Sequence, residues 1–459
     1  MSAETPVTPA PSRNPFRNPD FAKLWTAGTI SLFGTQVSQI AIPFIAVLVL
    51  KVPPFQVAVL GTLEFLPFLL FTLPAGVWVD RLPRRLILVG GDLGRAAMLA
   101  TIPIAYLLGV LTIWQLYVIA FVNGTLTVFF DIADQSYLPT VLERDQLVDG
   151  NARLAASAST AQVVGQPLGG GVVGLFGGPF AVVLDAISYV VSAVLIFTIR
   201  RRERASRPGP ATATGVTEEV ADTGPAGAAV AAEVAAAAHE PATDERPGLR
   251  REIADGLRFV LGNRYLRSIA ATTGSANLFS NISLGIFPVF VYVTLGLTPE
   301  TVGLIGGTFG AGALVGALIG SRIASTFGVG HAIVGAAAVF SPASLLVPLA
   351  SHDTALLLIG AAGFIGSCAS TVYNINQVSL RQSITPEPML GRMNATMRFI
   401  VWGTIPIGSI IGGLFATSFG VVAAIWLGAI GEAFTFLPVL LSPVRTLRAI
   451  PDAEPAAAG

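Results

Sequence analysis

Three ionisable side chains lie in the middle of long apolar runs, where they could bind and release protons. These are Glu64, Arg398 and Glu432, and the last two lie at matching depths that would let them pair. A charge at the centre of a bilayer costs roughly 2.5–3.5 kcal/mol even on the most lenient scale, so such residues face a partner or a cavity. Burial favours a protonated carboxyl group and a nearby arginine favours the ionised form, so alternation between the two could couple protons to a substrate. We therefore predict these residues as proton-coupling candidates, with static ion pairs or lone protonated acids as the alternative.

A second group of charges stands in and after one short loop. The stretch Gly76–Arg85 contains four charged residues among ten, in a chain in which only 12% of residues are charged. Shortly after it, Asp92 and Arg95 are spaced to pair along one face of a helix. We interpret this pair, and also Asp185 further on, as structural residues.

Uncharged polar residues form the third group, because amides persist in apolar segments where they bond across helices or face water. Interhelical packing is the alternative role for about half of them. The candidates for lining a substrate cavity are Gln36, Gln39, Asn123, Asn277, Asn281, Tyr373, Asn374, Asn376 and Gln377.

Composition excludes several other chemistries. The chain has one cysteine and three scattered histidines, so neither an internal disulfide nor a metal site with the usual ligand spacing is expected. Its lysines, Lys23 and Lys51, do not follow a glycine-rich loop, which argues against ATP hydrolysis at a P-loop. We expect no enzymatic activity, no cofactor, no metal and no nucleic-acid partner.

The elements that hold these residues are predicted to be membrane-spanning helices. Hydrophobic residues make up 53% of the 459 residues, and charged residues are half as frequent as the roughly 25% of soluble domains. A spanning helix needs roughly 20 mainly apolar residues, and twelve stretches qualify. They are about 22–50, 56–79, 86–109, 113–137, 147–176, 179–199, 265–296, 301–322, 329–350, 354–380, 388–417 and 421–441.

Arginine placement predicts the orientation of these spans. If the N-terminus is cytoplasmic, the inner loops hold nearly all loop arginines, whereas the outer loops hold Lys51 alone. Because basic residues are retained on the cytoplasmic side, we expect a multi-pass protein of the cytoplasmic membrane with both termini inside.

The domain order follows from the spans and from one stretch of different composition. Ala, Pro, Gly and Thr dominate the segment between spans six and seven, which cannot bury a core. After it, Leu249, Ile253, Leu257 and Val260 recur at helical spacing, which favours an amphipathic helix on the membrane surface or an extension of span seven. The predicted order is a disordered tail 1–20, a six-helix bundle 21–200, a disordered cytoplasmic linker 201–248, an amphipathic interfacial helix 249–263, a second six-helix bundle 264–442 and a tail 443–459.

An internal repeat relates the two bundles. Identical residues recur at one constant offset between spans five and eleven, as in Asn151/Asn394 and Gly169/Gly412. Two halves related by an axis along the membrane normal place a transport site at their interface. Small residues in the run Gly165–Gly170 would let helices approach closely.

The loop Gly76–Arg85 resembles the signature between the second and third helices of Major Facilitator Superfamily transporters, with Pro83 where most members carry glycine. Within the superfamily the chain is most similar to the bacterial macrolide/drug and enterobactin (siderophore) exporters. The residues that carry this similarity are 82–85, 91–95, 137–139, 147, 151–152 and 185–189.

The resemblance implies an all-α membrane protein of twelve transmembrane helices in two pseudo-symmetric six-helix bundles. It also implies an intracellular gate, in which Asp80 meets the start of span eleven and the arginines reach acids on span four. A role of Arg84 and Arg85 as topology anchors alone is the alternative. The gate residues are Gly76, Asp80, Arg81, Arg84, Arg85, Asp131 and Asp134. The residues that resemble the antiporter motif of superfamily exporters, with the proline displaced by one position, are Gly165, Pro167, Gly169 and Gly170.

We therefore expect a secondary transporter that exports amphipathic small molecules, drugs or siderophores, by alternating access and proton antiport. Its expected partners are the small-molecule substrate, protons and membrane lipids, and we expect a monomer. Two alternatives stay open: a transporter of the same fold that translocates lysophospholipids or other lipids, and an uptake symporter.

Overall fold

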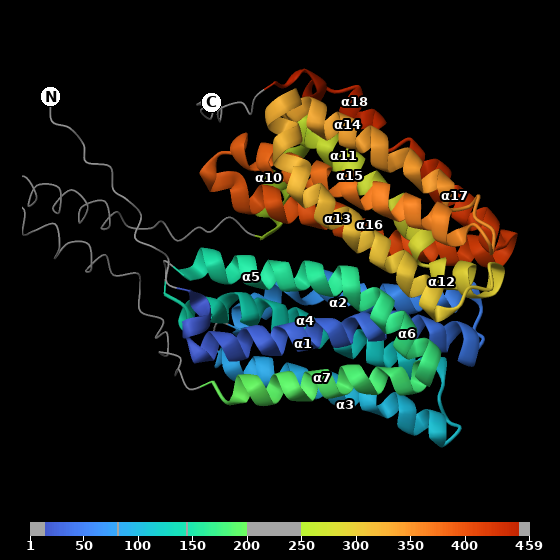
Figure 1. The fold of residues 1–459 in the computed structure, drawn as a ribbon. Coiled ribbons are helices and arrows are strands. Elements are labelled where there is room, and N and C mark those ends of the chain that lie inside the picture. The colour runs from blue at the N-terminus through green and yellow to red at the C-terminus, as the bar shows by residue number, and fades with distance from the viewer. Residues whose placement is uncertain (1–13, 80–81, 144–145, 200–248, 449–459) are drawn as a thin grey trace, which may run out of the picture. The chain divides into compact units, whose positions relative to one another are not determined.

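The computed structural model describes residues 14–79, 82–143, 146–199 and 249–448, and nearly all of them are helical (Figure 1). Eleven helices of this described part are long and apolar enough to cross a membrane. The remaining predicted span, about 147–176, is present as two α-helices joined by a π-helical turn, α5–η4–α6. The predicted all-α membrane class is therefore confirmed.

The helices form two sets of six spans, one before and one after residues 200–248. The first set contains η1 (Pro15–Arg17), α1 (Pro19–Phe44), η2 (Ile45–Val49), α2 (Pro54–Val79), α3 (Arg84–Leu107), α4 (Ile113–Val141), α5 (Leu147–Thr160), η4 (Ala161–Gly165), α6 (Gln166–Phe176) and α7 (Gly178–Phe197). The second contains α10 (Leu249–Gly262), α11 (Arg264–Leu284), α12 (Phe287–Val289), η5 (Phe290–Thr294), α13 (Pro299–Phe327), α14 (Val329–Ala343), η6 (Ser344–Leu346), α15 (Ala355–Ser383), α16 (Glu387–Phe419), α17 (Val421–Ala433), α18 (Leu437–Leu440) and η7 (Pro443–Thr446).

Local sequence explains where several of these helices begin. Asn18 accepts a hydrogen bond from the backbone of Asp20 and precedes a proline, so it caps α1. Thr112, Asn263 and Thr298 cap α4, α11 and α13 in the same way. These caps pair backbone N–H groups that would otherwise be unsatisfied at the ends of the spans.

Both predicted tails are shorter than expected. Residues 14–20 form η1 and the start of α1, because Asn18 both caps that helix and donates to the carbonyl oxygen of Val141 at 2.7 Å. At the other end η7 packs onto α14, since the N–H of Gly330 donates to the carbonyl oxygen of Leu447 at 2.9 Å.

The two halves pack by the same plan. In the first half α1 contacts α6 and α7, α2 contacts α4, and α3 contacts both α4 and α7. In the second half α11 contacts α16 and α17, α13 contacts α15, and α14 contacts both α15 and α17. Each of these contacts of the first half therefore has a counterpart in the second, which confirms the predicted pseudo-symmetric pair of six-helix bundles.

Glycines at repeat-equivalent positions support this common plan. A Cβ atom at Gly169 in α6 would lie 3.1 Å from the Cα atom of Val37 in α1. A Cβ atom at Gly412 in α16 would lie 3.0 Å from the Cα atom of Ile282 in α11. At both places two helix backbones lie so close together that a larger residue would push them apart. The repeat seen in the sequence is therefore a packing motif.

Basic side chains gather at one end of the helices, which we call the basic face. It is the end at which α1, α3 and α14 begin. The described loops at the other end, the opposite face, hold the basic residues Lys51 and His352. The arginines of the basic face include Arg17, Arg84, Arg85, Arg258, Arg322, Arg392, Arg445 and Arg448.

The predicted linker 201–248 lies outside the described residues. The range predicted for an amphipathic helix, 249–263, is occupied by α10. Its later part packs on α16, because a Cβ atom at Gly256 would lie 3.1 Å from the carbonyl oxygen of Arg392. Its predicted position on the membrane surface stays a prediction.

Candidate functional site

The two halves touch each other near the opposite face. A Cβ atom at Gly170 in α6 would lie 3.0 Å from the Cα atom of Gly303 in α13. Similarly, a Cβ atom at Gly413 in α16 would lie 3.0 Å from the Cα atom of Phe55 in α2. Gly170 and Gly413 are repeat-equivalent, so two symmetry-related helix crossings join the halves.

A third contact between the halves lies at the same end of the helices. The π-helical turns η2 and η5 close the first span of each half and occupy corresponding places. The ring of Phe44 stands edge-on to the ring of Tyr292, with 5.5 Å between centroids. Val47 and Val291 are buried in the same apolar cluster. The halves are therefore packed without intervening polar groups at this point.

An amide cluster lies where α1 and α6 of the first half meet α13 of the second. The side-chain amide of Gln166 donates to the Oε1 atoms of both Gln36, at 2.8 Å, and Gln39, at 2.9 Å. A Cβ atom at Gly306 of α13 would lie 2.6 Å from Oε1 of Gln166. Gln36 is buried and Gln39 is exposed, so the cluster extends from the packed interior to an accessible surface.

Gln166 was absent from the candidates chosen from the sequence, although it lies within the glycine run Gly165–Gly170. The signal that could have identified it is its amide group, which is out of place in a close-packed stretch of small residues. The predicted candidates Gln36 and Gln39 are brought together only through this third residue.

Among the remaining polar candidates, the two on α11 make hydrogen bonds. Asn123 is half-buried, and no partner for its Oδ1 atom is found among the described residues. Asn277 donates to the carbonyl oxygen of Val401 in α16 at 3.3 Å, and Asn281 donates to the carbonyl oxygen of Asn277 at 2.8 Å. The bond from Asn277 to α16 joins two helices of the second half.

Three candidates on α15 serve packing in this structure. Tyr373 is buried and its hydroxyl group pairs with that of Thr273 at 2.9 Å. Asn376 is buried and donates to the carbonyl oxygen of Val372 at 2.8 Å. Gln377 is also buried and donates at 2.8 Å to the side-chain oxygen of Asn374, the one exposed member of the set. These three residues therefore fit the packing role that the sequence left open for about half of the candidates, and Asn374 is the exposed one of the four.

Two of the proton-coupling candidates are glutamates whose carboxylates stand alone among the described residues. Glu64 is exposed in α2, and Glu432 is half-buried in α17. Among the described residues no hydrogen bond or ion pair is found for either carboxylate. Gly124 of α4 packs on the backbone of Glu64, since a Cβ atom there would lie 2.5 Å from the carbonyl oxygen of Glu64. The segment that holds Glu64 is therefore fixed against α4.

The equal depth predicted for Arg398 and Glu432 is wrong. Arg398 lies 21 residues before the end of α16 at Phe419, whereas Glu432 lies 11 residues after the start of α17 at Val421. Because these two helix ends are joined by one glycine, the positions differ in depth by about 15 Å at 1.5 Å per residue. The prediction failed because α16 contains 33 residues, more than a crossing requires. The side chain of Arg398 itself lies outside the described part.

A buried ion pair stands at the centre of the first half. Nη2 of Arg95 lies 2.5 Å from Oδ1 of Asp92, and the two side chains are almost fully buried. The guanidinium group also lies over the rings of Phe130 and Tyr189, 4.3 Å from each centroid. The predicted pairing along α3 is confirmed, and the arginine additionally joins α3 to α4 and α7.

Asp185 belongs to the same buried region. Its carboxylate accepts hydrogen bonds from Ser38 of α1 at 2.5 Å and from Ser188 at 3.1 Å. The hydroxyl group of Tyr189 pairs with that of Thr35 at 3.0 Å. These contacts tie α7 to α1 and agree with the structural role interpreted from the sequence.

The predicted gate is described only in part, because Asp80 and Arg81 lie outside the described residues. Gly76 is in the last turns of α2. Arg84 donates to the carbonyl oxygen of Ser136 in α4 at 3.3 Å. Arg85 donates to the carbonyl oxygen of Phe197 at the end of α7, and its guanidinium group lies 5.0 Å from the centre of that ring. Both arginines thus bind the ends of neighbouring spans at the basic face.

The acids proposed to meet these arginines lie near another cation. Asp131 is exposed and Asp134 is half-buried on α4. Arg95 acts electrostatically on both of them. The sequence placed the two acids at the end of span four and predicted that Arg95 pairs with Asp92, but it did not show that Arg95 also lies near these acids.

The run that resembles an antiporter motif packs against two helices, α1 and α13. Gly165 and Gly169 approach α1, and Gly170 approaches α13. Pro167 meets Gly307 of α13, where a Cβ atom would lie 2.7 Å from the proline ring. The π-helical turn η4 directly precedes this proline, which lacks the N–H group that a regular helix would use.

Comparison with known proteins finds relatives over nearly the whole chain. A family model described as transmembrane secretion effector matches residues 10–223 and 227–457. Macrolide efflux protein A of Streptococcus pyogenes is 22% identical over 404 residues, which cover 87% of this chain and 90% of that protein. The multidrug efflux pump Tap of Mycolicibacterium fortuitum is 25% identical over 376 residues, which cover 80% of this chain and 81% of the pump.

Two further comparisons are narrower in what they show. An uncharacterised MFS-type transporter of Bacillus subtilis, YkuC, is 26% identical over 196 residues, which cover 43% of this chain and 45% of that protein. A bacterial homologue of the iron transporter ferroportin, solved in an inward-facing state, superposes with a TM-score of 0.68 at 13% identity. That superposition covers 92% of this chain and 98% of the other, and it shows a shared fold.

Proposed function

This chain belongs to the transmembrane secretion effector family of the Major Facilitator Superfamily, and we propose that it exports amphipathic small molecules. It is a multi-pass membrane transporter. What we propose is the direction of transport, the class of substrate and the source of energy. The substrates would be drugs or siderophores, carried across the cytoplasmic membrane by alternating access. Proton antiport would supply the energy, and the chain would work as a monomer.

The observation that carries the proposal is the similarity to two efflux pumps over most of their length. The arrangement of the halves supports it, because a polar amide cluster lies at the interface where alternating access needs a substrate site. The cluster reaches an accessible surface at Gln39. Amide groups bind polar parts of a substrate without demanding a charge, which suits amphipathic molecules.

We place the basic face in the cytoplasm. At least eight arginines stand there, against Lys51 and His352 in the described loops of the opposite face, and arginine is retained on the cytoplasmic side. The two halves also pack on the basic-face side of the amide cluster, because a Cβ atom at Gly310 of α13 would lie 2.9 Å from the carbonyl oxygen of Gln162. The amide cluster therefore lies within the contact between the halves.

Export can be tested with everted membrane vesicles from a host that lacks its own drug pumps. We expect vesicles with this chain to accumulate a macrolide or an amphipathic dye when a proton gradient is imposed. A protonophore should reduce accumulation to the level of vesicles without the protein. Accumulation of a fluorescent lysophospholipid, with no drug or siderophore moved, would instead favour the lipid-translocating alternative.

We also propose that Gly76, Asp80, Arg81, Arg84 and Arg85 form the cytoplasmic gate. The bonds of Arg84 and Arg85 to the ends of α4 and α7 support this role, because both would have to change if these helices moved apart. Asp131 and Asp134 on α4 are the acids that the arginines would meet in the closed state.

Replacing Arg85 by alanine should abolish export while leaving the amount of protein in the membrane unchanged. Arg85→Lys keeps the positive charge but loses the planar group that contacts the Phe197 ring and carbonyl oxygen. If the arginine is only a topology anchor, the lysine variant will transport as well as the parent protein. The control is Arg445→Ala, which removes an exposed arginine of the same face, and vesicle accumulation is the measurement.

A further inference from the structure

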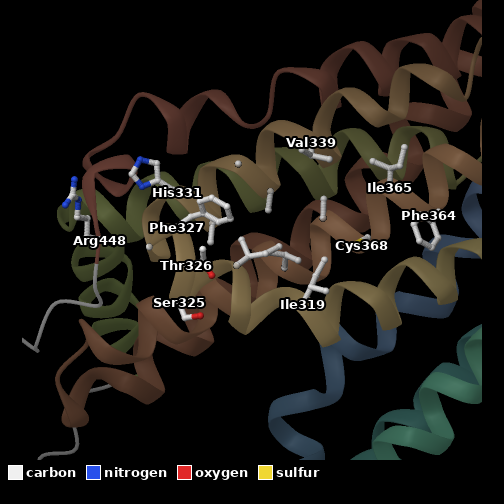
Figure 2. A pocket seen from close by; sticks show the side chains of 17 residues that line it. Ile319, Ser325, Thr326, Phe327, His331, Val339, Phe364, Ile365, Cys368 and Arg448 are labelled. Atoms are coloured by element: carbon white, nitrogen blue, oxygen red, sulfur yellow. The ribbon is translucent and has the colours of Figure 1, made fainter.

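A long apolar groove lies within the second half, away from the interface between the halves. Its volume is about 960 Å³, and it is lined by residues of α13, α14 and α15 and by Arg448 (Figure 2). Ile319 and Ile323 of α13 form one wall and Val339 of α14 belongs to the other. Phe364, Ile365 and Cys368 of α15 lie between them.

The depth of the groove matches one leaflet of a membrane. It begins at Gly328, where α13 and α14 are joined at the basic face, and extends along α14 as far as Val339. Eleven residues of helix at 1.5 Å each span about 16 Å, which is half of the roughly 30 Å hydrocarbon core. The apolar length is therefore suited to an acyl chain that enters from the basic face.

The chemistry of the lining changes at the end nearest the basic face. His331 and Arg448 are exposed there, whereas the remaining lining consists of apolar and small residues and two hydroxyl groups. No carboxylate belongs to the lining among the described residues. An acyl-length channel that ends in a cation and an imidazole is complementary to a lipid with a negatively charged headgroup.

The position of Arg448 is fixed by the backbone. The N–H of Gly330 holds the carbonyl oxygen of Leu447 at 2.9 Å. A Cβ atom at Gly328, whose φ is +88°, would lie 2.9 Å from the carbonyl oxygen of Arg448. The start of α14 therefore holds the chain segment that presents this arginine at the mouth of the groove.

From these observations we propose that the groove binds one anionic glycerophospholipid of the leaflet at the basic face. One acyl chain lies between α13 and α14 over α15, and the headgroup phosphate lies between Arg448 and His331. A zwitterionic lipid fits the apolar part equally well, but it offers less attraction to the arginine. Binding would hold α13 and α14 to the segment after α18, on the side of α13 away from its contact with α6.

Cys368, the single cysteine of the chain, lines the groove. The rate at which its thiol is modified therefore measures whether the groove is occupied. The full-length protein is placed in nanodiscs of phosphatidylcholine, with or without phosphatidylglycerol, and treated with a membrane-permeant maleimide. We expect phosphatidylglycerol to slow modification of Cys368 roughly fivefold, the factor that corresponds to about 1 kcal/mol for one arginine near a membrane surface. Cys368→Ala measures the background.

The variant His331→Ala/Arg448→Ala should lose this protection, and Arg445→Ala, which removes a neighbouring exposed arginine outside the groove, should keep it. Equal rates in the two lipids would overturn the proposal. So would equal protection in the double variant, or an equal loss in Arg445→Ala, which would indicate a general surface charge.

A second measurement does not depend on the thiol. Native mass spectrometry of the detergent-purified protein should show one phosphatidylglycerol retained by the parent protein and by Arg445→Ala, and none by the double variant. Retention of phosphatidylcholine to the same extent would overturn selection by the headgroup. Arg448→Lys, which keeps the charge, should retain the lipid if the double variant proves too unstable to purify.

Discussion

Replacing Asp92 by alanine is expected to destabilise the protein by about 3–5 kcal/mol, the usual cost of removing one partner of a buried ion pair. The variant leaves the guanidinium group of Arg95 buried between Phe130 and Tyr189 without its closest carboxylate. The measurement is the loss of monodisperse protein on heating, followed by size-exclusion chromatography.

The double variant Asp92→Leu/Arg95→Met separates the ion pair from the packing around it. Replacing both charges by apolar groups of similar size removes the uncompensated charge, so we expect most of the stability to return. Asp353→Ala, in an exposed turn between η6 and α15, should behave like the parent protein. A single Asp92 variant as stable as the parent would show that the pair contributes little to the first bundle.

The second large effect is expected from neutralising the two isolated carboxyl groups. We propose that Glu64 or Glu432 carries the coupling proton, because neither carboxylate has a recorded partner in the described residues and a lone carboxyl group in hydrocarbon can exchange a proton. Glutamine has nearly the same shape but cannot release a proton. If the glutamate replaced by glutamine is the one that carries the proton, gradient-driven accumulation of substrate should fall to the level found with a protonophore.

Each variant is assayed in everted vesicles with and without a proton gradient. Downhill movement of substrate without a gradient should persist, which distinguishes lost coupling from lost binding or folding. Glu143→Gln, an exposed acid beyond the end of α4, is the matched control. If accumulation remains proton-driven in both Glu64→Gln and Glu432→Gln, neither residue is the carrier.

Sequence and structure agree most closely on properties that depend on neighbouring residues in the chain. A span needs a sufficient length of apolar residues, so the positions of the helices could be predicted from local composition. The repeat was visible because pairs such as Gly169 and Gly412 must both be small to let two backbones approach. Asp92 and Arg95 were predicted to pair because a single helix fixes their spacing.

The predictions that local sequence could not support concern the depth of a residue in the membrane and the side of a helix on which it lies. Arg398 and Glu432 were given equal depths because the sequence does not show how far α16 extends beyond the membrane. Tyr373, Asn376 and Gln377 were candidates for either a cavity or helix packing, and the sequence could not tell that they are buried in the second bundle. In a helix that is apolar all round, no polar stripe indicates which side faces the core, so the sequence leaves its rotation open.

The amino-acid sequence by itself therefore determined the twelve spans, the sorting of arginines to one face and the repeat of the two bundles. All of these follow from the cost of placing polar groups in hydrocarbon. Only the tertiary structure decided that Gln166 joins Gln36 to Gln39 between the halves, and that Arg448 stands at the mouth of the groove containing Cys368. Such contacts between side chains depend on the rotation and register of packed helices. Many contacts across the fold together determine both.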